Sequence, residues 1–188
     1  MLKISFFSLV LFFLINSCQF DTYTSTEANY GEEITKYADE FDLPQAYLKS
    51  LIILECSGRK PAGKRFEPNV YKKLKEVQAG IRRKFEFVSR NQIIACSDAA
   101  LRNLATSWGP FQIMGYKCVK MGIIIKDLRG DDAIKWGVKW INNEYGYLLR
   151  KNEYEKAFRV HNTGSPSGRT YDKNYVQNGL EHINYFSN

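Results

Sequence analysis

The sequence predicts one domain that is mainly α-helical. Its 188 residues are 44% hydrophobic and 14% aromatic, which is enough for one buried core and excludes a disordered or collagen-like chain. Apolar residues recur at helical spacing through most of the chain, and no long stretch alternates as a strand would. The length corresponds to a single domain, and the sequence contains no internal repeat.

Residues 1–17 are typical of a signal peptide. Lys3 precedes an apolar run over residues 4–15, and the small residue Ser17 follows; such a run is too short to span a bilayer stably. The string L-I-N-S-C, which ends at Cys18, resembles a bacterial lipobox, in which cleavage before the cysteine leaves a lipidated thiol. This resemblance implies an exported protein that is anchored to a membrane through Cys18, in the bacterial cell envelope, facing the periplasm. The alternative is a plain secretory signal with Cys18 as an ordinary residue.

The next segment, residues 18–29, is polar, rich in Thr and Ser, and without periodicity. These features predict a tether, so the folded domain is expected over residues 30–188. Removal of residues 1–17 would leave 171 residues with 26 Lys and Arg against 20 Asp and Glu, because only Lys3 is charged in that segment.

The Lys and Arg residues are scattered rather than clustered on one helix face, which argues against a nucleic-acid partner. Outside the cytoplasm, a basic surface suits anionic envelope polymers or lipid headgroups. An ordinary solvated surface is the alternative.

A series of helices is expected after the tether. The segment 34–41 has apolar residues at helical spacing and ends before Pro44, which suits the first turn of a second helix that ends at Glu55. Ser97 and Asp98 form a good N-cap pair for a helix over 98–106. The segment 131–150 begins with two Asp residues and carries a long apolar stripe. Further helices are expected over 68–78, 153–160 and 172–186.

Two segments rich in Gly, Pro and small polar residues, 107–115 and 161–168, are expected to be loops. Loops of this kind, held by rigid helices, often carry functional sites. A third candidate is Glu55, because a carboxyl group at the end of an apolar helix meets the negative helix end and an apolar wall. Both effects favour the protonated form that a general acid needs. The alternative is an ordinary solvated glutamate.

Three blocks of sequence follow one another in a familiar order: E-C-S-G at 55–58, G-P-F-Q-I-M-G at 109–115 and H-N-T-G at 161–164. Together they resemble the lysozyme-like superfamily of peptidoglycan-cleaving enzymes, and in particular the lytic transglycosylases. The blocks F-E-P-N-V-Y at 66–71 and A-T-S-W-G-P-F-Q-I-M-G at 105–115 are similar to the phage-type N-acetylmuramidases. The resemblance covers about residues 30–186 and implies an α+β lysozyme-like domain with a substrate cleft.

By this resemblance, Glu55 is the general acid that protonates the β-1,4 glycosidic oxygen between N-acetylmuramic acid and N-acetylglucosamine. Gln112 corresponds to a sugar-binding glutamine, and Asn162 to the turn on the other side of the cleft. Tyr171 and Tyr175 suit sugar rings, with core packing as the alternative. The substrate-binding residues expected are Ser57, Ser107, Gly109, Phe111, Gln112, Ile113, Met114, His161, Asn162, Tyr171 and Tyr175.

The fate of the broken bond stays open at the level of sequence. A hydrolase that inverts needs a second carboxylate opposite the acid, and Glu67 is the best candidate, ahead of Asp98 and Asp172. The alternative for Glu67 is a helix-start carboxylate that stabilises backbone amides. Without a second carboxylate, the N-acetyl group of the substrate can attack, giving the 1,6-anhydro product of a transglycosylase.

Two residues depart from the family pattern. Cys56 replaces the serine that usually follows the glutamate, although Ser57 can substitute for its hydroxyl, and His161 stands where the transglycosylases usually have Tyr. A thiol nucleophile is disfavoured, because Cys56 lies at the negative end of a helix. The departures make credible an alternative function, a catalytically inactive lysozyme-like lipoprotein that only binds glycan, whereas the retention of Glu55 together with Gln112 favours the enzyme.

No cofactor is expected from the sequence. With Cys18 lipidated, Cys56, Cys96 and Cys118 remain, which allows at most one internal disulfide. No C-x-x-C pair, histidine cluster or phosphate-binding glycine loop is present, so neither a metal nor a nucleotide is implied. The expected partners are peptidoglycan glycan strands, the membrane and a cell-envelope machine that needs the wall opened locally.

Overall fold

The computed structural model describes the backbone of residues 6–188 and the side chains of residues 22–188. The first residues of the expected signal peptide and the side chain of Cys18, with its expected lipid, lie outside this range. The helices are α1 (Phe6–Phe41), α2 (Gln45–Cys56), α3 (Pro68–Gln78), α4 (Arg90–Ile93), α5 (Asp98–Leu104), α6 (Lys117–Met121), the 3-10 helix η1 (Ile125–Leu128), α7 (Ala133–Leu149), α8 (Tyr154–Thr163) and α9 (Tyr175–Ser187). The strands are β1 (Arg65–Phe66), β2 (Lys84–Phe85), β3 (Val88–Ser89), β4 (Thr106–Trp108) and β5 (Ile113–Met114).

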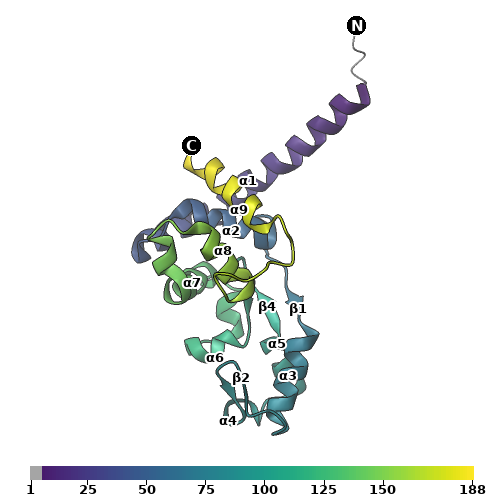
Figure 1. The fold of residues 1–188 in the computed structure, drawn as a ribbon, viewed down its shortest axis with the longest axis vertical. Helices are drawn as coiled ribbons and strands as arrows, with labels where there is room; N and C mark the ends of the chain where they lie inside the picture. Colours follow the sequence, from purple (N-terminus) through teal and green to yellow (C-terminus); the bar gives the residue numbers. More distant parts are fainter. Residues whose placement is uncertain (1–5) are drawn as a thin grey trace.

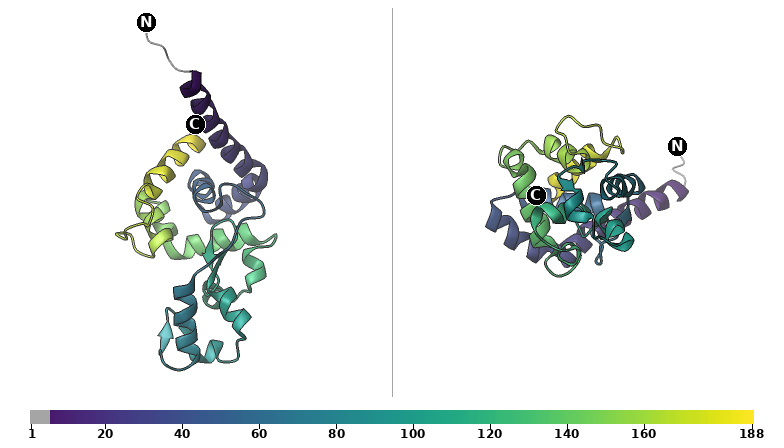
Figure 2. Two further views of the ribbon diagram at one scale, coloured as in Figure 1. Left: turned by 90° about the vertical axis from the view of Figure 1, so that its right-hand side faces the viewer. Right: turned by 90° about the horizontal axis from the view of Figure 1, so that it is seen from below.

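Two separate hydrophobic clusters divide the domain into two lobes (Figure 1). The larger cluster lies among α1, α2, α7, α8 and α9, which we call the large lobe. The smaller cluster lies among α3, β3, α4 and α5, and we call residues 64–105 the small lobe. The left-hand view of Figure 2 keeps the small lobe at the opposite end of the long axis from the start of α1.

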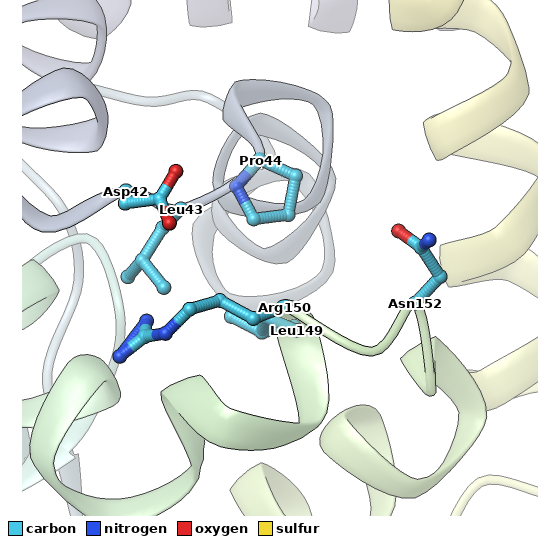
Figure 3. Close-up of a pocket in the computed structure, with 6 residues that line it drawn as sticks. All are labelled: Asp42, Leu43, Pro44, Leu149, Arg150 and Asn152. Carbon is cyan, nitrogen blue, oxygen red and sulfur yellow. The ribbon is translucent and has the colours of Figure 1, made fainter.

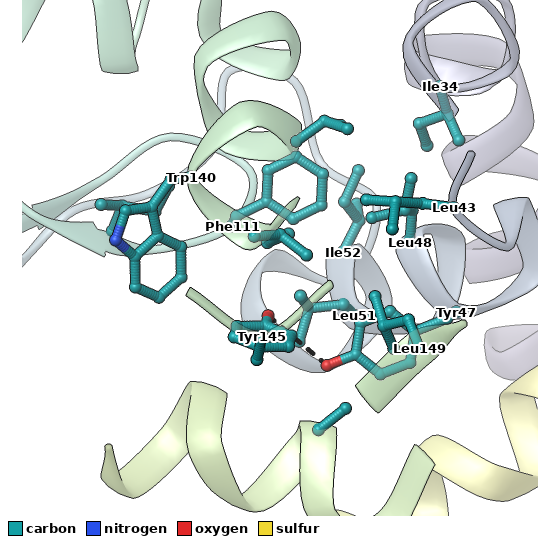
Figure 4. Close-up of a cluster of buried hydrophobic side chains, with 14 of the residues drawn as sticks. Ile34, Leu43, Tyr47, Leu48, Leu51, Ile52, Phe111, Trp140, Tyr145 and Leu149 are labelled. Carbon is teal, nitrogen blue, oxygen red and sulfur yellow. Dashed lines mark hydrogen bonds between the residues drawn. The ribbon is translucent and has the colours of Figure 1, made fainter. Parts of the chain in front are cut away.

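Helix α2 is the centre of the large lobe. It is apolar around most of its circumference, with Tyr47, Leu48, Leu51 and Ile52 fully buried (Figure 4). Helices α1 and α9 pack along it, and α7 closes the cluster from the other side. The helix ends at Ser57, whose left-handed backbone lets its N–H donate to the Ile53 carbonyl at 2.9 Å. This enclosure determines the surroundings of Glu55, one residue before the last.

A small antiparallel sheet, in the order β1-β4-β5, joins the lobes. The turn between β4 and β5 requires glycine at position 109, where φ is +74° and an added Cβ would lie 1.9 Å from the Leu128 carbonyl oxygen. Glycine at position 109 therefore lets the turn lie closer to η1 than any residue with a side chain would allow. The second sheet, the hairpin of β2 and β3, belongs to the small lobe.

The prediction of a single, mainly helical domain is confirmed. The expected helix over 68–78 has the same bounds as α3, and the expected helices over 98–106, 131–150 and 172–186 correspond to α5, α7 and α9 with slightly shorter ranges. Among the described residues, no helix combines the length and apolar character needed to cross a membrane.

The segment expected to be a tether is helical and partly packed on the domain. Tyr23 and Thr26 are buried, and the Tyr23 ring stacks on Tyr185 of α9 at a centroid distance of 3.6 Å. Thr26 lies where α1 approaches Gly58, so closely that a Cβ there would be 2.4 Å from its hydroxyl. The small Thr and Ser side chains allow α1 to approach Gly58 this closely. A segment with the composition of a linker can therefore form a packed helix.

The boundary of the expected loop 161–168 also differs. Helix α8 continues to Thr163 and ends at Gly164, which has a left-handed backbone. His161 and Asn162 therefore lie in the last helical turn, which gives their side chains a fixed direction. The loop begins only at Gly164.

We expect Tyr23→Ala to lower the free energy of unfolding by about 3 kcal/mol, because it removes a buried ring and the contact of its hydroxyl with His182 Nδ1 at 2.8 Å. Urea denaturation measures the change. The control is Thr24→Ala, on the exposed side of α1, with an expected change within about 0.5 kcal/mol. Equal stabilities of the two variants would mean that this segment is a tether after all.

Candidate active site

Glu55 lies in the last turn of α2 with its side chain only 16% exposed. Tyr175, the first residue of α9, donates its hydroxyl to Glu55 Oε1 at 2.5 Å. Burial raises the pKa of Glu55 to about 7, while the hydrogen bond from Tyr175 and the charge of Arg65 oppose the rise. Since Oε1 accepts from Tyr175, the proton of the acid form belongs on Oε2.

His161 approaches the same carboxyl group from the end of α8. Its Nε2 lies 3.1 Å from the Phe111 carbonyl oxygen, which can only accept, so Nε2 carries the hydrogen. The other nitrogen, Nδ1, then accepts from the hydroxyl of Tyr145 at 2.7 Å. Tyr145 in turn accepts from Tyr47 at 3.5 Å (Figure 4). One tautomer therefore satisfies a continuous chain of hydrogen bonds through the large lobe.

His161 is neutral in this arrangement. Burial and the charge of Lys117 lower its pKa to about 3, and the hydrogen bond to the Phe111 carbonyl only partly opposes these effects. Its Nε2 lies 3.7 Å from Glu55 Oε1, but a neutral ring forms no ion pair. His161 was expected to bind substrate. Both of its nitrogens are instead bonded within the protein.

Gln112 is held in the turn between β4 and β5. Its Oε1 accepts from Ser107 Oγ at 2.8 Å, and its Nε2 donates to the carbonyls of Gly63 and Gly109 at 2.8 and 2.9 Å. The amide therefore ties the turn to the segment before β1. Gln112 was expected to bind a sugar. In the structure its amide oxygen and nitrogen already have hydrogen-bond partners within the protein, so it acts as a positioning residue.

The three apolar residues expected to form the floor of a cleft are not equivalent. Phe111 and Ile113 are buried in the large cluster, and only Met114 is partly exposed. The Phe111 ring lies against Gly137 of α7, where a Cβ would come within 2.2 Å of it. Phe111 thus anchors the turn to the core through its ring and to His161 through its carbonyl.

Glu67 stands at the start of α3 but makes no hydrogen bond to the helix backbone. Its Oε1 instead accepts from Arg65 Nε at 2.6 Å. Arg65 also lowers the pKa of Glu55, so one guanidinium acts on both carboxyl groups. Asp98 and Asp172, the weaker candidates, are bonded locally: Asp98 to Arg102 and Asp172 to the Asn174 backbone.

The predicted tyrosines have different positions. Tyr175 is buried beside Phe158 and is also bonded to Glu55, and the Asn162 side chain bonds to its hydroxyl. Tyr171 lies in the loop before α9 and is fully exposed. The structure therefore brings Glu55, His161, Asn162 and Tyr175 together and leaves Tyr171 apart.

The residues after Glu55 offer no nucleophile. Cys56 is buried, and burial raises the pKa of its thiol to about 11. Its Sγ is directed to the Arg59 carbonyl at 3.8 Å. Ser57 is exposed at the helix end. The cysteines at positions 56, 96 and 118 are all free thiols.

Three residues of the site were not predicted from the sequence: Arg65, Tyr47 and Tyr145. The two tyrosines appeared only as apolar members of helical patterns, and periodicity does not show where a hydroxyl points. The kink of α7 at Tyr145, where φ is −150°, directs this hydroxyl toward His161. The neighbouring Gly146 is a sequence signal of an irregularity, but Gly137 in the same helix is another, so glycine alone does not locate the kink.

A hollow of about 310 Å³ lies elsewhere, between the turn after α1 and the end of α7 (Figure 3). It is lined by Asp42, Leu43, Pro44, Leu149, Arg150 and Asn152. None of the predicted site residues is among them. Within the described part of the chain, no group of His, Cys, Asp and Glu could hold a metal ion.

No family model, curated protein or solved structure matches this chain. Functional inference therefore depends on the arrangement around Glu55 and on the sequence motifs that contribute to it.

We expect the Glu55 carboxyl to titrate near pH 7. Carbon-13 NMR of the labelled side chain measures this titration. In Tyr175→Phe the midpoint should rise, because the hydroxyl that favours the carboxylate is lost. Glu155→Gln, an exposed change on α8, should leave it unmoved. A midpoint near 4.5 in the wild type would contradict the burial of Glu55.

The same shift predicts a pH dependence of stability. A folded-state pKa above the unfolded value favours folding at low pH, and this stability is lost as pH rises from about 4.5 to about 7. Glu55→Gln, which carries no charge, should exceed the wild type in stability by up to about 3 kcal/mol at pH 8 and by much less at pH 4. Urea denaturation at the two pH values tests the difference.

Proposed function

We propose that this chain is a lysozyme-like enzyme that cleaves the glycan strands of peptidoglycan, with Glu55 as the general acid. The proposal carries with it the α+β lysozyme-like fold and the exported, lipid-anchored location suggested by the sequence. The single observation that supports it best is the state of Glu55. A buried carboxyl with a pKa of about 7 and one oxygen bound by Tyr175 can donate a proton from the other oxygen.

The surrounding residues favour this role through position. The neutral His161 lies near the carboxyl without supplying the positive charge that would keep it ionised. Tyr175 fixes its orientation. Glu55, His161 and the turn of residues 109–115 come from the three sequence blocks on which the resemblance rests, and hydrogen bonds or close contacts connect them.

In the proposed reaction, Glu55 protonates the leaving glycosidic oxygen as the C–O bond breaks, and an oxocarbenium-like state forms. Two routes follow. In hydrolysis, Glu67 activates a water on the opposite face of the sugar. In the transglycosylase route, the N-acetyl oxygen of the substrate attacks the anomeric carbon. Glu55 then removes a proton from the 6-hydroxyl group, whose oxygen bonds to the anomeric carbon as the bond to the N-acetyl oxygen breaks, which closes the 1,6-anhydro ring and restores the acetamido group.

We expect Glu55→Gln to reduce the release of muropeptides from purified sacculi by about 10²- to 10⁴-fold, the usual contribution of a general acid. Chromatography with mass spectrometry measures the release. Wild-type activity should also decline as pH rises through about 7, because the acid form of Glu55 is lost. Glu155→Gln, on the exposed face of α8, is the matched control and should retain full activity.

Equal release by the wild type and Glu55→Gln would remove Glu55 from the catalytic role. No release by either protein, together with retention on sacculi, would favour the glycan-binding module instead of the enzyme.

Glu67→Gln distinguishes the two routes. If Glu67 activates water, the variant should lose activity by about 10²-fold or more, and wild-type products should end in reducing sugars. If the N-acetyl group of the substrate attacks instead, the variant should cleave at the wild-type rate and the products should carry 1,6-anhydro ends.

A further inference from the structure

The net charge of the chain is concentrated in one lobe. Residues 64–105 contain ten Lys and Arg against four Asp and Glu, a net +6, whereas the whole chain has a net charge of +7. The rest of the chain holds 17 Lys and Arg against 16 Asp and Glu, so nearly all of the basic excess lies in the small lobe. Its far end, away from the start of α1, is formed by the end of α3, the β2–β3 hairpin and α4 (Figure 1).

This end, residues 79–95, combines charge with exposed aliphatic groups, and we call it the tip. It carries four basic residues, Arg82, Arg83, Lys84 and Arg90, against one acid, Glu86. Ile81 is 80% exposed and Ile94 is 49% exposed. An isoleucine this exposed has most of its apolar surface in water, which costs free energy unless a partner covers it.

Hydrogen bonds to α3 and from its last residue fix the conformation of the tip. The backbone N–H groups of Ile81 and Arg82 both donate to the Glu76 carbonyl, at 2.9 and 3.1 Å. Gln78, at the end of α3, donates to the carbonyls of Ile93 and Cys96, which fixes the turn that carries Ile94. Ile81 and Ile94 therefore both lie at the C-terminal end of α3.

Part of the charge at the tip is also unpaired. Arg82 bonds to Glu76 at 3.0 Å. In the part of the chain that the structure describes, no acidic side chain lies within ion-pair distance of Arg83 or Lys84, and both are exposed. Two cations next to Ile81 are thus available to an anionic partner.

We propose that the tip docks on a membrane surface that contains anionic lipids. Arg83 and Lys84 would meet the lipid phosphates, and Ile81 and Ile94 would enter the boundary between headgroups and acyl chains. A hydrophilic polyanion matches the charges but leaves the isoleucines in water, so a lipid surface satisfies both features. The proposal uses none of the residues around Glu55 and does not depend on the proposed enzymatic function. Because the tip lies at the opposite end of the long axis from the start of α1, the surface on which it docks is not the one that would hold a lipid on Cys18.

The test is flotation of the full chain with phosphatidylcholine vesicles, with and without phosphatidylglycerol. The apolar N-terminal segment can contact both kinds of vesicle, so the readout is the ratio of the two affinities. Arg83→Gln with Lys84→Gln should lower this ratio by about 25-fold, since each basic residue near an anionic surface contributes about fivefold. The matched control, Lys151→Gln with Arg169→Gln, alters exposed residues of the large lobe and should leave the ratio unchanged.

A second pair of variants tests insertion. Ile81→Ser with Ile94→Ser should weaken binding to the anionic vesicles by about tenfold, from the apolar area withdrawn. The control is Ile124→Ser, since Ile124 is 64% exposed but lies outside the tip, and this variant should bind the anionic vesicles like the wild type. Binding that survives the charge change would overturn the proposal. So would binding that is insensitive to the isoleucine pair and is abolished by soluble polyphosphate, because this result would indicate a polyanion site.

Discussion

Burial of the Glu55 carboxyl group is the constraint on which the rest of the large lobe depends. Helix α2 can be apolar on nearly every side because α1, α7 and α9 enclose it, and this enclosure removes water from its last turn. An ionised carboxylate there would be costly, so the group shifts its pKa instead. The hydroxyl of Tyr175 limits the cost without supplying a countercharge. The result is a carboxyl group that exchanges its proton near neutral pH.

The same enclosure demands that every other polar group near α2 find a partner. Tyr47 and Tyr145 bury their hydroxyls, and a neutral His161 that carries its hydrogen on Nε2 completes a chain in which Tyr47 donates to Tyr145 and Tyr145 donates to Nδ1. In the described part of the chain, no buried side-chain nitrogen or oxygen lacks a hydrogen bond. A protonated His161 would reverse this chain, because Nδ1 would then donate to the Tyr145 hydroxyl and Tyr145 could no longer donate to it. The fold thus fixes the state of the histidine and with it the surroundings of Glu55.

The sequence predicted the features that depend on local patterns. The bounds of α3 and the apolar nature of α2 followed from periodicity and from proline, and Glu55 followed from its place at the helix end. The packed part of α1 was missed because the Thr and Ser residues of 22–26 are typical of linkers, yet their small size is what permits contact with Gly58. The bonding of Gln112 and His161 within the chain was also missed, because tertiary contacts decide whether a polar side chain faces a ligand or the protein.

The two lobes act on Glu55 in opposite directions. The large lobe withdraws it from water and raises its pKa, whereas Arg65, from the positively charged small lobe, lowers it. A pKa of about 7 is the balance of burial against the hydrogen bond from Tyr175 and the charge of Arg65. Charges act over about 8 Å at physiological salt, so an anionic group lying over Arg65 would weaken its influence on the carboxyl. Occupancy of that surface by an anionic partner would then raise the pKa of Glu55 and increase the fraction of the acid form that can donate a proton.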